Sequence, residues 1–312
     1  MGLGHKIKSA LPPVLRVMFR VGQRLKLNIT PNHFYSDIPD LRSLSADRSW
    51  CRPMSFEGIS GASIESQRAF FEQTVTPLAG RFADLSIYDA GCRANGEPGY
   101  GPIEALFLHA YIQTHRPRRV VQVGCGVTTA IILAAADEVK HPIEVTCVEP
   151  YPTANLRRLH AAGRIVLKAE PAQITPMATF TDLDDGDLLF IDSTHTIKVG
   201  SEVVRLMNEV FGRLRPGVRI HLHDITFPYD YNPRTLEPTI FFWRETTLLY
   251  ARLLGDPTLR IDCSLSMLHD AASDAIRAGI PAYVPQPMID GLSQRVEGHY
   301  PSATYLRKVA GA

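Results

Sequence analysis

Polar side chains capable of acid–base and metal-binding chemistry end two apolar segments of the sequence. Asp192 ends the run DLLFID, with His195 three residues later, and His223 and Asp224 lie near the end of the run GVRIHLHDI. An imidazole titrates near neutral pH and can take a proton from a hydroxyl group. Two carboxylates can instead hold Mg²⁺ or another divalent cation, which lowers the pKa of a bound hydroxyl. The two segments therefore predict proton transfer or metal-assisted chemistry.

The two chemistries assign different roles to these residues. In the first, His195 or His223 is the catalytic base, with Asp192 beside them; in the second, Asp192 and Asp224 are the metal ligands. Asp224 has His223 before it and Ile225 after it, so the side chain next to this carboxylate offers a nitrogen ligand and not a second oxygen ligand. A shell that includes histidine favours a transition metal over Mg²⁺, or no metal at all. Both routes stay open from the residues alone.

A second candidate site is the glycine turn in VVQVGCGVTT, residues 120–129. An apolar strand is predicted to run into Gly124 and Gly126, and a helix to follow. Glycine lets the backbone approach a ligand closely, and the helix N-terminus offers free amides. Glu149 ends the next apolar run, IEVTCVEP, near the spacing at which a carboxylate accepts hydrogen bonds from ribose hydroxyls. These features suit a nicotinamide cofactor and S-adenosylmethionine equally.

Helices and apolar strands that alternate along the chain after residue 101 would position these residues. Helices are predicted at 102–115, 127–137, 153–161, 196–213 and 240–254. The predicted strands are RRVVQVG, IEVTCVEP, RIVLKAE, DLLFID, GVRIHLHDI and TLRIDCS. Near-continuous apolar strands between helices are typical of a parallel sheet that is covered on both faces. Ligands of such a sheet bind beyond the carboxyl ends of its strands, where the candidate residues lie.

The same motifs resemble those of class I S-adenosylmethionine-dependent methyltransferases. VVQVGCGVTT is similar to their first motif and VEPYP to their acidic second motif, while DLLFIDSTH and GVRIHLHDI resemble their fourth and fifth strand ends. The resemblance covers about residues 100–264 and resumes at 302–308, SATYLRK. The subgroup with F-I-D-S-[ST]-H and H-D-I motifs is the most similar, and its better-known relatives include metal-assisted O-methyltransferases of sugars and catechols.

The resemblance implies an α/β fold with a doubly wound, mostly parallel sheet, in which residues 302–308 form an antiparallel last strand. It also implies a cofactor site in which Glu149 binds the ribose and either Tyr151 or a residue near Glu170 lies by the adenine. The full set of implied cofactor contacts is Gly124, Gly126, Thr128, Glu149, Tyr151 and Asp192. Gln122 departs from the first motif, which usually has Glu or Asp at this position.

The rest of the chain is predicted to surround this domain. Residues 1–100 form a helical and irregular annex that covers the site or pairs subunits in a homo-oligomer, and residues 101–312 form the cofactor-binding domain, with an insertion near 280–301. Within the annex, residues 13–27 have the spacing of an amphipathic helix, with Arg16, Arg20 and Arg24 four apart. We expect this helix to pack on the main domain, with docking to a membrane surface or a partner as alternatives.

Composition narrows the class of protein. The net charge of +1 argues against a nucleic-acid partner. Five scattered cysteines, an odd number, predict free thiols and a cytoplasmic setting. No apolar run approaches the roughly 20 residues that span a bilayer.

The sequence therefore predicts methyl transfer from S-adenosylmethionine to an oxygen of a small-molecule metabolite, with a hydroxyl as acceptor and metal assistance as one route. The aromatic segment 225–245, with Tyr229, Tyr231 and Trp243, would cover the acceptor. A carboxylate acceptor, oriented by Arg234 or Arg244 and giving a methyl ester, is the first alternative. An NAD-dependent oxidoreductase is the second, although no Tyr-x-x-x-Lys arrangement stands out after the fourth strand.

Overall fold

The computed structural model describes residues 3–32, 35–231, 242–286 and 297–311. The chain divides into two compact units, Met1–Trp50 and Cys51–Ala312. The helices between residues 64 and 95 pack within the second unit, whereas the domain boundary drawn from the sequence lies near residue 100.

The first unit consists of helices and extended segments. Its helices are α1 (Leu3–Arg24) and α2 (Leu41–Ala46), and η1 (Ser49–Cys51) follows at the boundary. Asp40 caps α2, where its carboxylate accepts hydrogen bonds from the backbone amides of Arg42 and Ser43. No apolar side chain that the structure describes in this unit is fully buried. The helix predicted at 13–27 is present, although α1 starts earlier and ends at Arg24.

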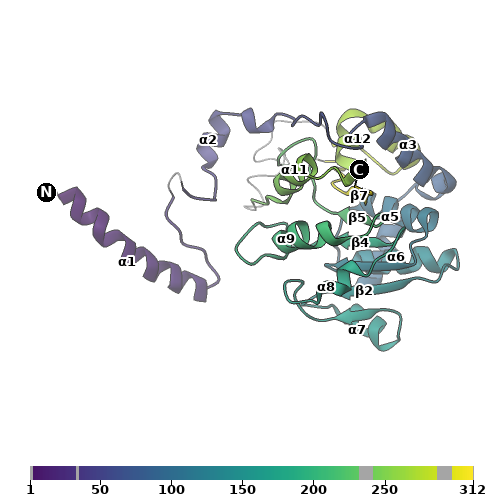
Figure 1. The fold of residues 1–312 in the computed structure, drawn as a ribbon, viewed down its shortest axis with the longest axis horizontal. Coiled ribbons are helices and arrows are strands. Elements are labelled where there is room, and N and C mark those ends of the chain that lie inside the picture. Colours follow the sequence, from purple (N-terminus) through teal and green to yellow (C-terminus); the bar gives the residue numbers. More distant parts are fainter. Residues whose placement is uncertain (1–2, 33–34, 232–241, 287–296, 312) are drawn as a thin grey trace. The chain divides into compact units, whose positions relative to one another are not determined.

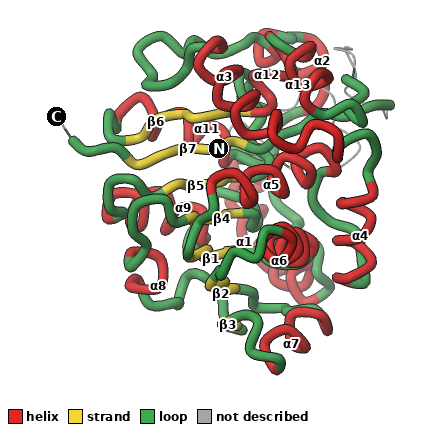
Figure 2. The backbone as a smooth tube through the Cα atoms, turned by 90° about the vertical axis from the view of Figure 1, so that its right-hand side faces the viewer, coloured by secondary structure: helices red, strands yellow, loops and turns green. Residues whose placement is uncertain are grey.

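A mixed seven-stranded sheet forms the centre of the second unit. Its strand order is β3-β2-β1-β4-β5-β7-β6, visible as the stack of yellow strands in Figure 2. β1 pairs in parallel with β2 and β4, while β7 runs antiparallel between β5 and β6. The strands are β1 (Arg119–Val123), β2 (Glu144–Val148), β3 (Val166–Lys168), β4 (Leu188–Ile191), β5 (Arg219–Leu222), β6 (Leu259–Ser264) and β7 (Thr304–Lys308). The predicted sheet and its antiparallel last strand are confirmed.

Helices cover both faces of the sheet (Figure 1). Successive residues of a strand point to opposite faces, so Val120 and Leu188 belong to one apolar core and Val121 and Leu189 to the other. The first core packs against α3 (Ile64–Val75), α4 (Ser86–Asn95), α5 (Pro102–His115), α6 (Val127–Glu138), α7 (Ala154–Ala161), α12 (Leu265–Ala271) and α13 (Ser273–Gly279). The second packs against α8 (Met177–Thr181), α9 (Glu202–Arg205) with its continuations η3 (Leu206–Val210) and η4 (Phe211–Arg213), and α11 (Glu245–Gly255).

Several helix boundaries differ from the sequence-based ones, and the helix expected at 240–254 begins at Glu245, as α11. The helical region expected at about 64–87 consists of α3, the short η2 (Thr76–Arg81) and the start of α4, which extends to Asn95 and ends at the left-handed Gly96. The helix expected at 196–213 begins only at Glu202, because the Ser201 hydroxyl caps it by accepting from the Val204 amide. Residues 195–201 are therefore a loop beside the site.

Candidate active site

The glycine turn after β1 touches the end of β4. Gly124 has a φ of +81°, and a Cβ at this position would lie 1.7 Å from the carbonyl oxygen of Asp192. Only glycine allows this approach, because any other side chain would overlap the backbone of the neighbouring strand. The segment expected to bind the cofactor and the strand end expected to do chemistry are therefore in direct contact.

Glu149 lies beside the glycine turn, as its position at the end of β2 predicts. One carboxylate oxygen accepts a hydrogen bond from the Cys125 amide at 3.2 Å, and the other accepts from the Tyr151 amide at 2.8 Å. The Tyr151 side chain is 87% exposed. Gly126 precedes α6, whose first amides face the turn.

Gln122, which departs from the first motif, joins β1 to α6. Its side chain is fully buried; its amide donates to the Thr128 hydroxyl at 3.1 Å and accepts from the Thr129 hydroxyl at 2.8 Å. The Thr128 side chain, expected at the cofactor, is thus buried against β1. A contact from residue 128 to a ligand would have to come from its backbone.

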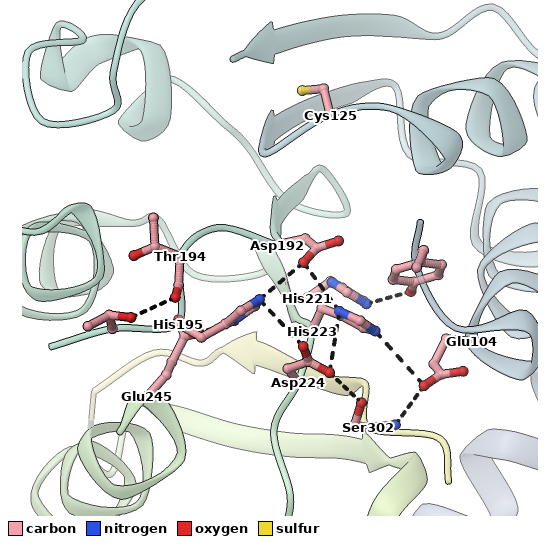
Figure 3. Close-up of polar contacts among 12 residues, drawn as sticks. Glu104, Cys125, Asp192, Thr194, His195, His221, His223, Asp224, Glu245 and Ser302 are labelled. Carbon is pink, nitrogen blue, oxygen red and sulfur yellow. Dashed lines mark hydrogen bonds and ion pairs between the residues drawn. The ribbon is translucent and has the colours of Figure 1, made fainter. Parts of the chain in front are cut away.

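The four strand-end residues singled out from the sequence meet in one cluster (Figure 3). Oδ1 of Asp192 lies 3.2 Å from Nδ1 of His223 and 3.4 Å from Nε2 of His195. Oδ2 of Asp224 lies 3.6 Å from Nε2 of His195, and its Oδ1 lies 3.7 Å from Nδ1 of His223. Two imidazoles therefore face the same two carboxylates.

Two buried glutamates that sequence analysis missed complete the cluster. Glu245, the first residue of α11, lies 2.7 Å from Nδ1 of His195. Glu104, in the first turn of α5, lies 3.9 Å from Nε2 of His223 and accepts from the Ser302 amide at 2.8 Å. The Ser302 hydroxyl in turn donates to Asp224 at 2.9 Å. A single acid in the otherwise apolar start of α5 was a usable signal for Glu104, whereas an acid at the start of a helix is too common to single out Glu245.

Backbone strain is concentrated in the same cluster. His195 and Asp224 have φ values of +56° and +55°, in the left-handed region that residues with a side chain rarely adopt. Such conformations persist only where the surrounding structure holds them, and they gather at functional sites. The strain supports a functional role for this cluster.

Burial disfavours the charged forms of these side chains, and the opposite charges of their neighbours offset this effect. Burial raises the pKa of Asp192. The charge of His223 and the hydrogen bonds from both histidines have the larger, opposite effect and hold this pKa well below its usual range. Burial lowers the pKa of His195, but its bonds to Asp192 and Glu245 raise it well above 6.5. For His223 burial also acts downward, yet the charges of Asp224 and Asp192 raise the pKa to about 9. Burial raises the pKa of Glu104 and of Glu245. The carboxylates around the two rings therefore favour the positively charged form of His195 and His223.

His221, two residues before His223, has a different environment. It is fully buried, stacks on Phe190 with ring centres 4.0 Å apart, and shares a 2.9 Å hydrogen bond with the Tyr100 hydroxyl. Burial and the charge of His223 hold its pKa well below 6.5. It therefore packs in the interior of the protein.

Parts of the chain are similar to known proteins. Residues 121–225 match a family model described as a methyltransferase domain. Over these residues the chain is therefore similar to a methyltransferase domain. An uncharacterized protein of Archaeoglobus fulgidus is 25% identical over 196 residues, which are 58% of this chain and 84% of that protein. The SAH-bound structure of a Podospora anserina methyltransferase is 16% identical, covers 90% of this chain and 100% of its own, and has a TM-score of 0.42.

The matched residues 121–225 include the glycine turn, Glu149 and the polar residues at the ends of β4 and β5. Glu104 and Glu245, which flank the two histidines, lie outside the matched residues 121–225.

The donor set of the methyltransferase domain fits a divalent cation. Asp192, His195 and His223 each offer one ligand atom, and these atoms lie within 4.8 Å of one another. The outer nitrogen of each imidazole faces a glutamate, which is how metal-bound histidines are held in many proteins. The sequence named Asp192 and Asp224 as ligands; Asp224 lies beside the set, 3.6 Å and 3.7 Å from the two rings.

The aromatic segment expected over the acceptor is described in part. The Trp243 ring lies 5.0 Å from the His195 ring, whereas Tyr229 is buried and its hydroxyl donates to Asp270 at 2.9 Å. Residues 232–241, which include Arg234, lie outside the described residues, as do residues 287–296 of the expected insertion. Arg244 pairs with Asp230 at 3.0 Å. All five cysteines are free thiols, and no described helix is long and apolar enough to cross a membrane.

Proposed function

We propose that this methyltransferase transfers the methyl group of S-adenosylmethionine to a hydroxyl oxygen of a small molecule at the carboxyl ends of β4 and β5. The contact between Gly124 and Asp192 carries the proposal, because it joins the cofactor turn to the polar cluster. A methyl donor bound at the turn would have its sulfonium carbon within reach of an acceptor held by the cluster.

The cofactor site uses the backbone more than side chains. Gly124, Gly126 and the amide of Thr128 would face the methionine moiety, and Glu149 the ribose, with Tyr151 nearest the adenine. Glu149 already accepts two backbone hydrogen bonds, which fix its carboxylate beside the turn. The family match to methyltransferases favours this cofactor over NAD.

The chemistry we favour is metal-assisted. Asp192, His195 and His223 would hold the cation, with Asp224 beside them, and the cation would lower the pKa of the acceptor hydroxyl. Glu245 and Glu104 would orient the imidazoles, and Trp243 would exclude water next to His195. The support is electrostatic: four carboxylates surround two imidazoles, and the raised pKa values of both rings reflect a field that also attracts a cation. Proton removal by His195 itself is the alternative.

The first experiment measures the melting temperature with S-adenosylhomocysteine, with NAD and with neither, before and after treatment with a chelator. A ligand that binds only the folded state at about 100 times its Kd adds about 2.7 kcal/mol, which is readily visible as a shift. We expect a shift with S-adenosylhomocysteine alone. A shift with NAD alone would overturn the methyltransferase proposal.

The second experiment measures formation of S-adenosylhomocysteine with panels of hydroxylated and carboxylated small molecules, with and without Mn²⁺ or Mg²⁺. We expect turnover with hydroxylated acceptors that the chelator abolishes and a divalent cation restores. Full activity of Asp192→Asn and Asp224→Asn in the presence of chelator would overturn the metal route. Turnover with carboxylated acceptors only would mean that the methyl acceptor is a carboxylate and not a hydroxyl.

A further inference from the structure

The N-terminal segment has a charge opposite to that of the rest of the chain. Residues 1–36 contain no Asp or Glu and six of the 33 Lys and Arg residues, so residues 37–312 carry 27 basic against 32 acidic side chains. The six basic residues are Lys6, Lys8, Arg16, Arg20, Arg24 and Lys26. The overall charge of +1 therefore conceals a strongly basic N-terminal segment.

α1 separates this charge from an apolar face. Val14, Met18 and Val21 recur at spacings of four and three residues, which places them on one side of the helix, and Leu25 follows directly after its end at Arg24. Arg16, Arg20 and Arg24 recur every four residues and lie on another face, which begins beside this stripe at Arg24. The four apolar side chains are exposed in the first unit.

Among the residues described in the first unit, none covers this apolar face. No apolar side chain described in the unit is fully buried, although most of the stability of a helix in a protein comes from packing of its apolar face. An apolar stripe beside a cationic face is typical of helices that lie in the plane of a membrane interface. The described helices include none that could span a bilayer, so α1 would lie on the surface.

We propose that α1 binds the surface of an anionic phospholipid membrane, with Val14, Met18, Val21 and Leu25 toward the acyl chains and the arginines at the phosphate groups. Residues 37–312 carry an excess of acidic side chains, so the electrostatic attraction comes from the N-terminal segment. Docking of α1 on the acidic part of a second copy would use the arginines but leave the apolar stripe in water. A lipid surface accommodates both faces at once.

The test is co-sedimentation of the full chain with vesicles of phosphatidylcholine that contain phosphatidylglycerol, and with vesicles of phosphatidylcholine alone. We expect binding to the anionic vesicles that weakens as salt is added. The combined change Arg16→Glu, Arg20→Glu and Arg24→Glu should lower the affinity by about tenfold or more. The matched control, Arg118→Glu, Arg213→Glu and Arg277→Glu, makes the same change of charge at exposed positions of the second unit and should retain binding.

A second variant tests the apolar face. Val14→Ser, Met18→Ser and Val21→Ser should abolish vesicle binding while all arginines remain. Equal binding to neutral vesicles, or unchanged binding of the α1 arginine variant, would overturn the proposal. So would a chain that ignores vesicles but self-associates through the face that the serine variant removes. The melting shift with S-adenosylhomocysteine should be the same in all variants, which separates this result from the test of the methyltransferase function.

Discussion

At the scale of single residues, the two glutamates behind the histidines decide what the site offers a ligand. A carboxylate at Nδ1 of His195 favours the tautomer with its proton there, so the neutral ring presents the Nε2 lone pair to Asp192 and Asp224. Glu104 faces Nε2 of His223 in the same way, although at 3.9 Å. The inner nitrogens thus point at one place, where a cation or an acceptor proton would be bound.

Glu245→Gln tests this orientation. The amide removes the negative charge next to His195, so the pKa of His195 should fall toward its ordinary value. Loss of such an outer partner typically lowers metal affinity by about 10–100-fold. NMR titration of the histidines and calorimetric titration with Mn²⁺ would measure both effects.

Glu209→Gln, an exposed acid on η3, is the control and should change neither quantity. If Glu245→Gln left the pKa of His195 and the Mn²⁺ affinity unchanged, Glu245 would have no positioning role.

At the scale of elements, the turn between β1 and α6 depends on its glycine. Gly124 and Gly186 have nearly equal φ values, +81° and +79°, but a Cβ on Gly186 would meet no atom within 4 Å. Gly186→Ala should therefore lower the free energy of unfolding only by the strain of the left-handed backbone, about 1–2 kcal/mol. Gly124→Ala also pushes β4 away, and the two effects together should cost about 3 kcal/mol or more.

Denaturant unfolding of the two variants measures this difference, and the melting shift with S-adenosylhomocysteine should persist only in Gly186→Ala. Equal stability of the two variants would mean that the contact with Asp192 is not required.

Elements were easier to predict than the contacts between them. The helix at 102–115 and the strands of the sheet follow from runs of apolar residues and from the lengths of these runs, which are local properties. The four strand-end residues could be expected to meet because parallel strands end at the same edge. Glu245 could not be expected there, because its contact with His195 spans 50 residues and depends on how α11 packs. The late start of the helix after His195 was missed. Ser201 caps this helix with its hydroxyl, but the presence of a serine does not by itself show that its side chain adopts the capping geometry.

The packing of α3 on α5 makes stability depend on pH. His115, at the end of α5, stacks on Phe70 and shares a 3.0 Å hydrogen bond with the Thr74 hydroxyl. Burial, with a smaller effect of Arg219, lowers its pKa to about 4. The unfolded chain then binds this proton more readily, so stability falls as the pH falls from about 6.5 toward about 4.

In His115→Gln, which keeps a partner for Thr74, the loss of stability between these pH values should be smaller. The measurement is the free energy of unfolding at several pH values for both proteins; groups shared by both cancel in the difference. An identical pH dependence in the two proteins would contradict the assigned pKa.

At the scale of the whole molecule, the basic N-terminal segment and the segment that contains the apolar cores meet in the same region of the sequence. The buried residues of both apolar cores, among those that the structure describes, lie between Ile59 and Leu306. The segment before Asp37 supplies a cationic helix, and none of its described side chains belongs to either core. The second unit should therefore contain what is needed to fold and to bind the cofactor, while the first supplies a separate property.

A chain that begins at Cys51 tests this division. We expect it to unfold in one transition with a melting temperature within about 2–4 °C of the full chain, which corresponds to about 1 kcal/mol for a domain of this size. The shift with S-adenosylhomocysteine should be retained and vesicle binding lost. A much larger fall in melting temperature would show that the first unit stabilises the core. Loss of the ligand shift with normal stability would instead mean that residues 1–50 complete the site, as expected of an annex that covers it.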